Sequence, residues 1–192
     1  MMHAEPSRVR PVAMSDLMIR ALQANCKTVT RRLSTSPLAH VRPGDLLWVR
    51  EAIIIEGVNC TPGRLYVRFE ADGFQMDVPW PRRMAKPLPG VRGPRAMPLE
   101  LSRMTLRVIH VHEERLHAIQ ERDCYDEGIG ATGLLDAADG DPVAAFARFW
   151  DGQHTKDGTR WADNPEVVAI RFACMHRGVK ALLPGLGHGG VR

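Results

Sequence analysis

The residue types most able to do chemistry gather in one short segment, residues 26–33, which reads CKTVTRRL. It combines a lysine, two threonine hydroxyls and two guanidinium groups within eight positions. If the segment begins with a turn of helix, Lys27 and Thr30 come together, whereas a fully extended chain sends them to opposite faces. A lysine close to a threonine can remove the hydroxyl proton, or activate a water, when burial or a neighbouring cation lowers the lysine pKa. The same residues also fit a cationic helix end that bonds its own last carbonyl groups.

A second group of candidates lies on a predicted strand over residues 46–51. In a strand, Trp48 and Arg50 share one face, so they can line a cleft, stack on a base and hold a phosphate. The alternative is that Trp48 lies in the core and that Arg50 pairs with an acid. His110 and His112 alternate on another predicted strand, but their spacing indicates no third ligand, and the sequence holds no phosphate-binding loop. We therefore expect neither a metal nor a cofactor.

The elements that must position these residues follow from periodicity. A helix is predicted from Ser15 to about Asn25, and the β-branched residues after it predict an extended segment. Residues 79–98 hold six prolines and predict a long loop. Further strands are predicted over residues 46–51, 64–70, 104–112 and 167–172, and further helices over residues 119–127 and 142–150. Strands enclosing few helices favour an α+β fold built on a small mixed β-barrel.

Length and composition bound the organisation of the chain. With 192 residues, 44% hydrophobic and 25% charged, the sequence predicts one domain with one core. We place that domain at residues 14–174, between an N-terminal tail (1–13) and a disordered C-terminal tail (175–192), with a Pro/Arg-rich loop insertion at residues 74–98. The four cysteines lie far apart, which argues against disulfides and structural zinc. Because no apolar run has the length of a signal peptide or a membrane span, we expect a cytoplasmic protein with no membrane partner.

Two motifs carry a resemblance to a known family. The stretch ALQANCKTVTRR (residues 21–32), followed by PGDLLWVRE (residues 43–51), resembles the signature of the ASCH (activating signal cointegrator homology) family. Residues 97–108, 115–129 and 161–172 are similar to the longer ASCH-like proteins of bacteriophage and prophage genomes. Together the matches span residues 17–172.

The resemblance implies a PUA-like mixed β-barrel with flanking helices and a cleft that takes RNA or a modified nucleoside. In its K-x-x-T motif the chain is similar to the N4-acetylcytidine amidohydrolases, which implies Lys27 as base, Thr30 as nucleophile or water-positioning group, and Glu127 as the group that handles protons. Asp123 and Asp126 lie close to Glu127 in the sequence, and the helix register decides which carboxylate faces the cleft. The candidate substrate-binding residues are Arg31, Arg32, Trp48 and Arg50.

Two other classes of function stay open at this point. The first is an RNA-binding module without catalysis, or a single-strand ribonuclease, in which the same cations hold phosphates. The second is a phage accessory or assembly protein whose basic loop, near Trp80, meets a protein partner. The exact substrate, the oligomeric state and the role of the loop over residues 74–98 do not follow from the sequence.

Overall fold

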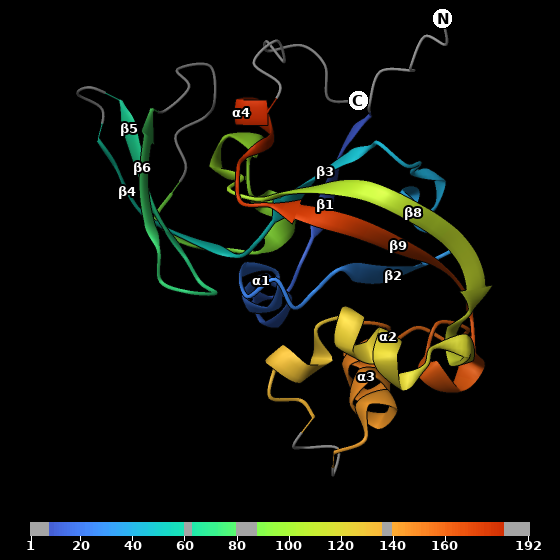
Figure 1. The fold of residues 1–192 in the computed structure, drawn as a ribbon. Helices are drawn as coiled ribbons and strands as arrows, with labels where there is room; N and C mark the ends of the chain where they lie inside the picture. The colour runs from blue at the N-terminus through green and yellow to red at the C-terminus, as the bar shows by residue number, and fades with distance from the viewer. Residues whose placement is uncertain (1–7, 60–62, 80–87, 136–139, 183–192) are drawn as a thin grey trace, which may run out of the picture.

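The computed structural model describes residues 8–59, 63–79, 88–135 and 140–182, which form two β-sheets and a helical layer (Figure 1). The larger sheet has five strands in the order β1-β3-β8-β9-β2. These strands are β1 (Val9–Ala13), β3 (Leu46–Arg50), β8 (Thr105–Arg115), β9 (Glu166–Met175) and β2 (Val29–Leu33). β1 pairs with β3 in parallel, and every other pairing in this sheet is antiparallel.

The smaller sheet has four antiparallel strands in the order β6-β5-β4-β7 and stands to one side of the larger sheet (Figure 1). Its strands are β4 (Ile53–Asn59), β5 (Arg64–Phe69), β6 (Gln75–Pro79) and β7 (Gly90–Arg92). The described helices are α1 (Asp16–Gln23), α2 (Glu121–Asp126), α3 (Pro142–Asp151) and α4 (Val179–Leu182). None of them is long and apolar enough to cross a membrane.

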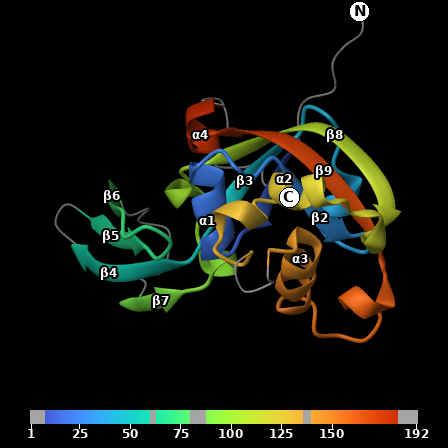
Figure 2. The same cartoon turned by 60° about the horizontal axis from the view of Figure 1, so that its bottom comes forward.

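Three clusters of buried side chains hold these layers together. α1 buries Met18, Ile19 and Leu22 against the larger sheet, because these residues recur at helical spacing. The smaller sheet has its own cluster around Val67 and Phe69. A third cluster joins α2 and α3 to the end of the larger sheet. In Figure 2, α3 lies beside α2 and below β2, so the helical layer lies next to the strand at the edge of the larger sheet.

The α+β class predicted from the sequence is confirmed, and the predicted strands and helices are present with bounds shifted by a few residues. The predicted barrel is not confirmed. Among the described residues, the strands form two sheets and no closed barrel.

Three other expectations are corrected. Residues 9–13, expected in a tail, form β1 and pair with β3. The predicted loop over residues 79–98 contains β7, and the insertion at residues 74–98 also contains β6, so this segment completes the smaller sheet. Residues 179–182 of the predicted C-terminal tail form α4, while residues 183–192, like Trp80, lie outside the described residues.

Candidate active site

Lys27 lies in the connection between α1 and β2, and its side chain is almost completely buried, with 2% of the residue exposed. α1 ends at Gln23, and Asn25 then adopts a left-handed conformation (φ 56°) that turns the chain back. The Lys27 amide still donates to the carbonyl of Ala21 at 3.2 Å, before β2 begins at Val29. The turn of helix that the sequence analysis considered at the start of residues 26–33 is not present, since residues 26–28 are irregular; the bond from Lys27 to Ala21 instead caps the end of α1 and leaves the lysine side chain buried.

Glu127, directly after α2, meets Lys27 from the opposite side of the site. Nζ of Lys27 donates to the Glu127 carboxylate at 2.7 Å and to the Glu127 backbone carbonyl at 2.8 Å. The other carboxylate oxygen accepts from the backbone N–H of Arg31 at 2.7 Å. Of the three neighbouring acids, Glu127 is the one that contacts Lys27, since Asp126 bonds Thr28 and Arg171, and Asp123 lies 3.5 Å from Arg31.

Gly128 makes this approach possible. It has a positive φ of 91°, and a Cβ placed there would lie 2.8 Å from the Cβ of Ala21 and 3.2 Å from that of Lys27. A side chain at this position would therefore push the end of α2 away from the end of α1. Glycine lets the two segments touch, which keeps Glu127 within hydrogen-bonding distance of Lys27.

Burial dominates the electrostatics of Lys27. Desolvation lowers the pKa of Lys27 below the ordinary lysine value, since it outweighs the attraction of Glu127. The nearby guanidinium groups of Arg32 and Arg31 lower the pKa further. Nζ makes both of its hydrogen bonds to Glu127, so when Lys27 loses a proton its two remaining N–H groups still have partners and its lone pair is left over.

Arg31 is buried and held by acids on three sides. Its Nε lies 2.7 Å from Glu114, its Nη1 3.3 Å from Glu127 and its Nη2 3.5 Å from Asp123. Its charge is therefore matched within the protein. Arg31 lines the pocket described below, but it acts there as a counterion for Glu127 and not as a free ligand for a phosphate.

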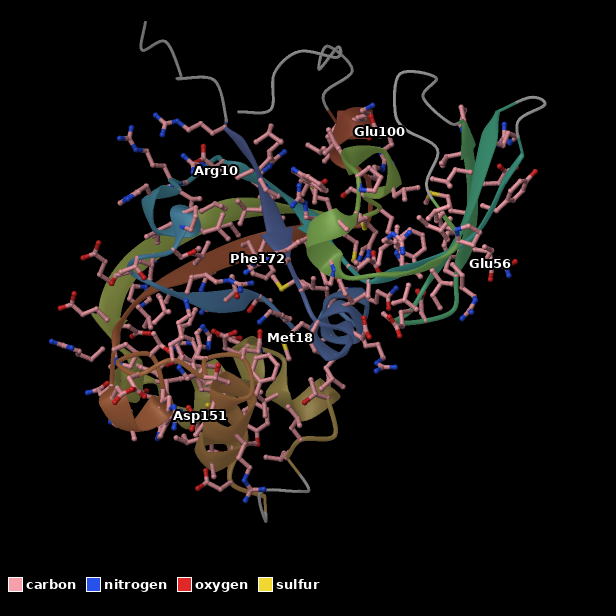
Figure 3. The ribbon with its side chains drawn as sticks, turned by 180° about the vertical axis from the view of Figure 1, so that it is seen from behind. Arg10, Met18, Glu56, Glu100, Asp151 and Phe172 are labelled. Carbon is pink, nitrogen blue, oxygen red and sulfur yellow. The ribbon has the colours of Figure 1, made fainter. Side chains whose placement is uncertain are left out.

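Lys27 opens onto a narrow pocket of about 20 Å³. Its lining comes from the start of α1, from β2, from Glu127 and from α3: Ala13, Met14, Ser15, Met18, Lys27, Thr30, Arg31, Arg32, Glu127, Phe146, Phe149, Trp150, Gln153 and His154. In Figure 3, Met18 marks α1 and Asp151 marks the end of α3, the two helices on either side of this space.

Two polar groups in the pocket lack partners. Thr30 is 4% exposed, and its hydroxyl makes no hydrogen bond with any described residue. Nε of Arg32 is enclosed and also has no partner, although Nη2 of the same residue donates to the carbonyl of Ala13 at 3.1 Å. A hydroxyl and a guanidinium N–H are thus available beside a desolvated amine.

The aromatic wall of the pocket comes from α3. Phe146, Phe149 and Trp150 lie on one side of this helix, and Trp150 is fixed by a hydrogen bond from its Nε1 to the carbonyl of Thr159 at 2.8 Å. The sequence analysis predicted a helix over residues 142–150 but did not place its aromatic residues at the site. The pocket continues into a wider groove of about 440 Å³, and Ser15 and Arg32 are among the residues that line both.

Trp48 and Arg50 do not join the other predicted site residues. Trp48 is 2% exposed and packs in the cluster of the smaller sheet. The guanidinium of Arg50 lies 4.4 Å from the centre of the Trp48 ring and donates to the carbonyl of Arg95 at 3.2 Å. Neither residue lines the pocket. The structure therefore brings together Lys27, Thr30, Arg31, Arg32 and Glu127, and it places Trp48 in the core.

Comparisons with known proteins add no assignment. No family model, curated protein or solved structure matches this chain. Within the part of the chain that the structure describes, no three His, Cys, Asp or Glu side chains gather closely enough to hold a metal ion. What the site offers chemically is therefore an amine with a lowered pKa, a carboxylate bonded to it and a free hydroxyl.

Proposed function

We propose that this protein is an ASCH-type, PUA-like hydrolase that removes the acyl group from a modified nucleoside of the N4-acetylcytidine type. The observation that carries the proposal is the buried pair of Lys27 and Glu127 opening onto the same pocket as the unpartnered hydroxyl of Thr30. The family name rests on the sequence motifs around this pair, and the chemistry rests on its geometry.

The groove next to the pocket supports a small ligand. Its volume of about 440 Å³ lies within the range of small-molecule sites, roughly 300–1,000 Å³, whereas the pocket beside Lys27, at about 20 Å³, has room for about one water-sized group. Phe149, the partly exposed aromatic residue of the pocket wall, offers apolar surface against which a base can pack. Polar groups lie on the side of β2, so that the amide of an acylated base faces Lys27 and Thr30.

The reaction that fits these groups is hydrolysis of an amide. Neutral Lys27 accepts the proton of the Thr30 hydroxyl, or of a water that Thr30 positions, and the resulting oxygen attacks the acyl carbon. The free N–H of Arg32 can stabilise the negative charge on the carbonyl oxygen of the tetrahedral intermediate. The carbon–nitrogen bond then breaks, and the proton held by Lys27 passes through Glu127 to the leaving amine. When water is the attacking group, the acid is released directly; when Thr30 attacks, a water then hydrolyses the acyl ester of Thr30, which releases the acid and returns the proton to the Thr30 hydroxyl.

The experiment that tests this function measures release of acetate and cytidine from N4-acetylcytidine. Lys27→Met and Thr30→Val keep the size of each side chain and remove its reactive group, so each is expected to lower kcat roughly 100- to 10,000-fold. Thr28→Val is the matched control, because the Thr28 hydroxyl bonds Asp126 and Thr28 does not line the pocket. All three variants are first compared with wild type by circular dichroism.

Each result decides between the candidate functions. Turnover that is lost in both variants and kept in the control supports the amidohydrolase. A folded Lys27→Met protein with wild-type turnover contradicts the role of Lys27. If wild type shows no turnover at high enzyme concentration, this substrate is excluded, and binding of single-stranded RNA at several salt concentrations becomes the next measurement, since phosphate binding weakens steeply with salt.

A further inference from the structure

The wider groove next to the pocket is lined by polar groups that the proposed reaction does not use. It shares Ala13, Met14, Ser15, Arg32, Gln153 and His154 with the pocket and adds Asp16, Ala52, Pro94 and Arg95. A ligand whose reactive end lies beside Lys27 therefore extends into this groove.

His154 presents a hydrogen-bond acceptor to the groove. Its Nδ1 lies 3.0 Å from the backbone carbonyl of Trp150, and its ring stacks on the Trp150 ring at 3.9 Å between centroids. A carbonyl only accepts hydrogen bonds, so the proton of the neutral ring is on Nδ1, and Nε2 carries a lone pair. Nε2 has no hydrogen-bond partner among the described residues, and His154 lines both the pocket and the groove.

The neutral form of His154 is favoured by its surroundings. Burial lowers the pKa of His154 below the ordinary value of 6.5, and the charge of Arg32 on β2 acts in the same direction. The bond to the Trp150 carbonyl and the charge of Asp151 on α3 act in the opposite direction without reversing the effect. Nε2 therefore stays an acceptor at neutral pH.

Asp16 presents a second acceptor. It is the first residue of α1, and neither oxygen of its carboxylate has a hydrogen-bond or ion-pair partner among the described residues. Its Oδ1 is enclosed within the protein, so the oxygen that a ligand in the groove can reach is Oδ2, which has no donor from a described residue either.

These two acceptors select the chemistry of the ligand. A phosphate can accept from Arg32 and Arg95, which also line the groove, but a phosphate dianion has no donor to offer Asp16 and His154. Hydroxyl groups can donate to both residues and can also accept from Arg32 on the same wall. A sugar with two neighbouring hydroxyls has this pattern, and the 2′-hydroxyl is the group that distinguishes ribose from deoxyribose.

We propose that the groove is a ribose subsite, in which the Asp16 carboxylate and Nε2 of His154 accept hydrogen bonds from the sugar hydroxyls of a ribonucleoside. This inference rests on the proposed function, because that function places the reacting amide beside Lys27. The protein then distinguishes ribonucleosides from deoxyribonucleosides at a position remote from the reacting amide.

The test is direct binding of cytidine, 2′-deoxycytidine and 3′-deoxycytidine by calorimetry, which needs no turnover. Loss of a hydroxyl that bonds a charged or strongly accepting group is expected to weaken binding roughly ten- to a hundredfold for at least one deoxynucleoside. Asp16→Asn removes the charge, and His154→Phe keeps the ring stacked on Trp150 but removes Nε2. Both variants are expected to bind cytidine less tightly and to lose the preference. Glu113→Gln, an exposed acid on β8, is the matched control and keeps it.

Three results overturn the inference, and they are distinguishable from one another. If wild type binds all three nucleosides equally, the ribose subsite is excluded, while the amidohydrolase stands. If the preference is present but survives in both Asp16→Asn and His154→Phe, the assignment of these residues is wrong. If no nucleoside binds to wild type, the proposed function and the subsite are excluded together. The comparison of ligands on wild type decides the question even if one variant does not fold.

Discussion

Glu127→Gln tests whether the site depends on a buried ion pair. In wild type one carboxylate oxygen accepts from the Arg31 amide and the other from Nζ of Lys27, both at 2.7 Å. A glutamine has one carbonyl oxygen and one NH₂ group in these two places. Whichever way the amide turns, its NH₂ group faces another donor, so the substitution replaces an attraction by a repulsion without changing the shape of the side chain.

The expected loss of stability is large because both partners are buried, with side-chain exposures of 1% for Lys27 and 3% for Glu127. Removing one partner of a buried ion pair costs about 3–5 kcal/mol. For a protein of this size, 3–5 kcal/mol lowers Tm by about 6–20 °C.

The loss is expected to depend on pH in a defined direction. The folded-state pKa of Lys27 lies below its unfolded value of 10.5, so the native state loses stability as pH falls from 10.5 towards the folded pKa. Glu127 raises the folded-state pKa of Lys27, so removing Glu127 lowers that pKa. The pH range over which the native state loses stability then extends to lower pH. At high pH, neutral Lys27 can accept a hydrogen bond from the new amide. The difference between variant and wild type is therefore largest near pH 7 and smaller near pH 10.

Urea unfolding of both proteins at the two pH values measures this difference. Glu114→Gln is the control, because Glu114 bonds the Arg31 side chain at 2.7 Å but is partly exposed and does not touch Lys27. It is expected to cost about 1 kcal/mol, equally at both pH values. If Glu127→Gln costs less than about 1 kcal/mol at pH 7, or if its cost grows with pH, the description of Lys27 as a desolvated amine held by Glu127 is refuted.

Three further predictions concern other parts of the site. Gly128→Ala is expected to lower the free energy of unfolding in urea by about 1–3 kcal/mol more than Gly133→Ala. Both glycines have a positive φ, but only a Cβ at position 128 would lie 2.8 Å from the Cβ of Ala21. Equal losses in the two variants would contradict the close packing at Gly128. Trp48→Phe is expected to keep nucleoside turnover within about threefold, because this ring lies in the core of the smaller sheet; a folded variant without turnover would place it at the site. An NMR titration is expected to give His154 a pKa below 6.5, and a value above 6.5 would remove the neutral acceptor from the groove.

The sequence predicted those elements whose hydrophobic pattern is regular over their length. β8 alternates in its first half, β9 has a continuous apolar run from Val167 to Ile170, and α1 has a clear helical stripe. β1 was missed because it is short, lies in a charged segment and contains Pro11, which a strand tolerates at the edge of a sheet. β6 and β7 were read as loop because of the surrounding prolines. Their strand conformation comes from pairing with β5 and β4, a long-range interaction that local pattern does not contain.

The site was predictable to the extent that it is local. Lys27, Thr30, Arg31 and Arg32 lie within six positions, so their types and spacing alone indicated chemistry. Glu127 is 100 residues away from Lys27, and only the family resemblance pointed to it. The spacing of residues in the sequence did not predict the aromatic wall of α3 or the groove around His154. Both are assembled from elements that meet only in the folded chain.

The dependence of Lys27 on α3 explains why the local motif alone does not determine its chemistry. Desolvation is the largest cause of the lowered pKa, and part of the enclosing wall is Phe146, Phe149 and Trp150. A K-x-x-T segment at an exposed helix end would keep a lysine pKa near its ordinary value and would bind anions as a cation. Buried opposite α3 and held by Glu127, the lysine of the same segment has a pKa below its ordinary value. The lowered pKa of Lys27 is thus a property of the folded chain, in which residues 100 or more positions away in the sequence share the lining of its pocket.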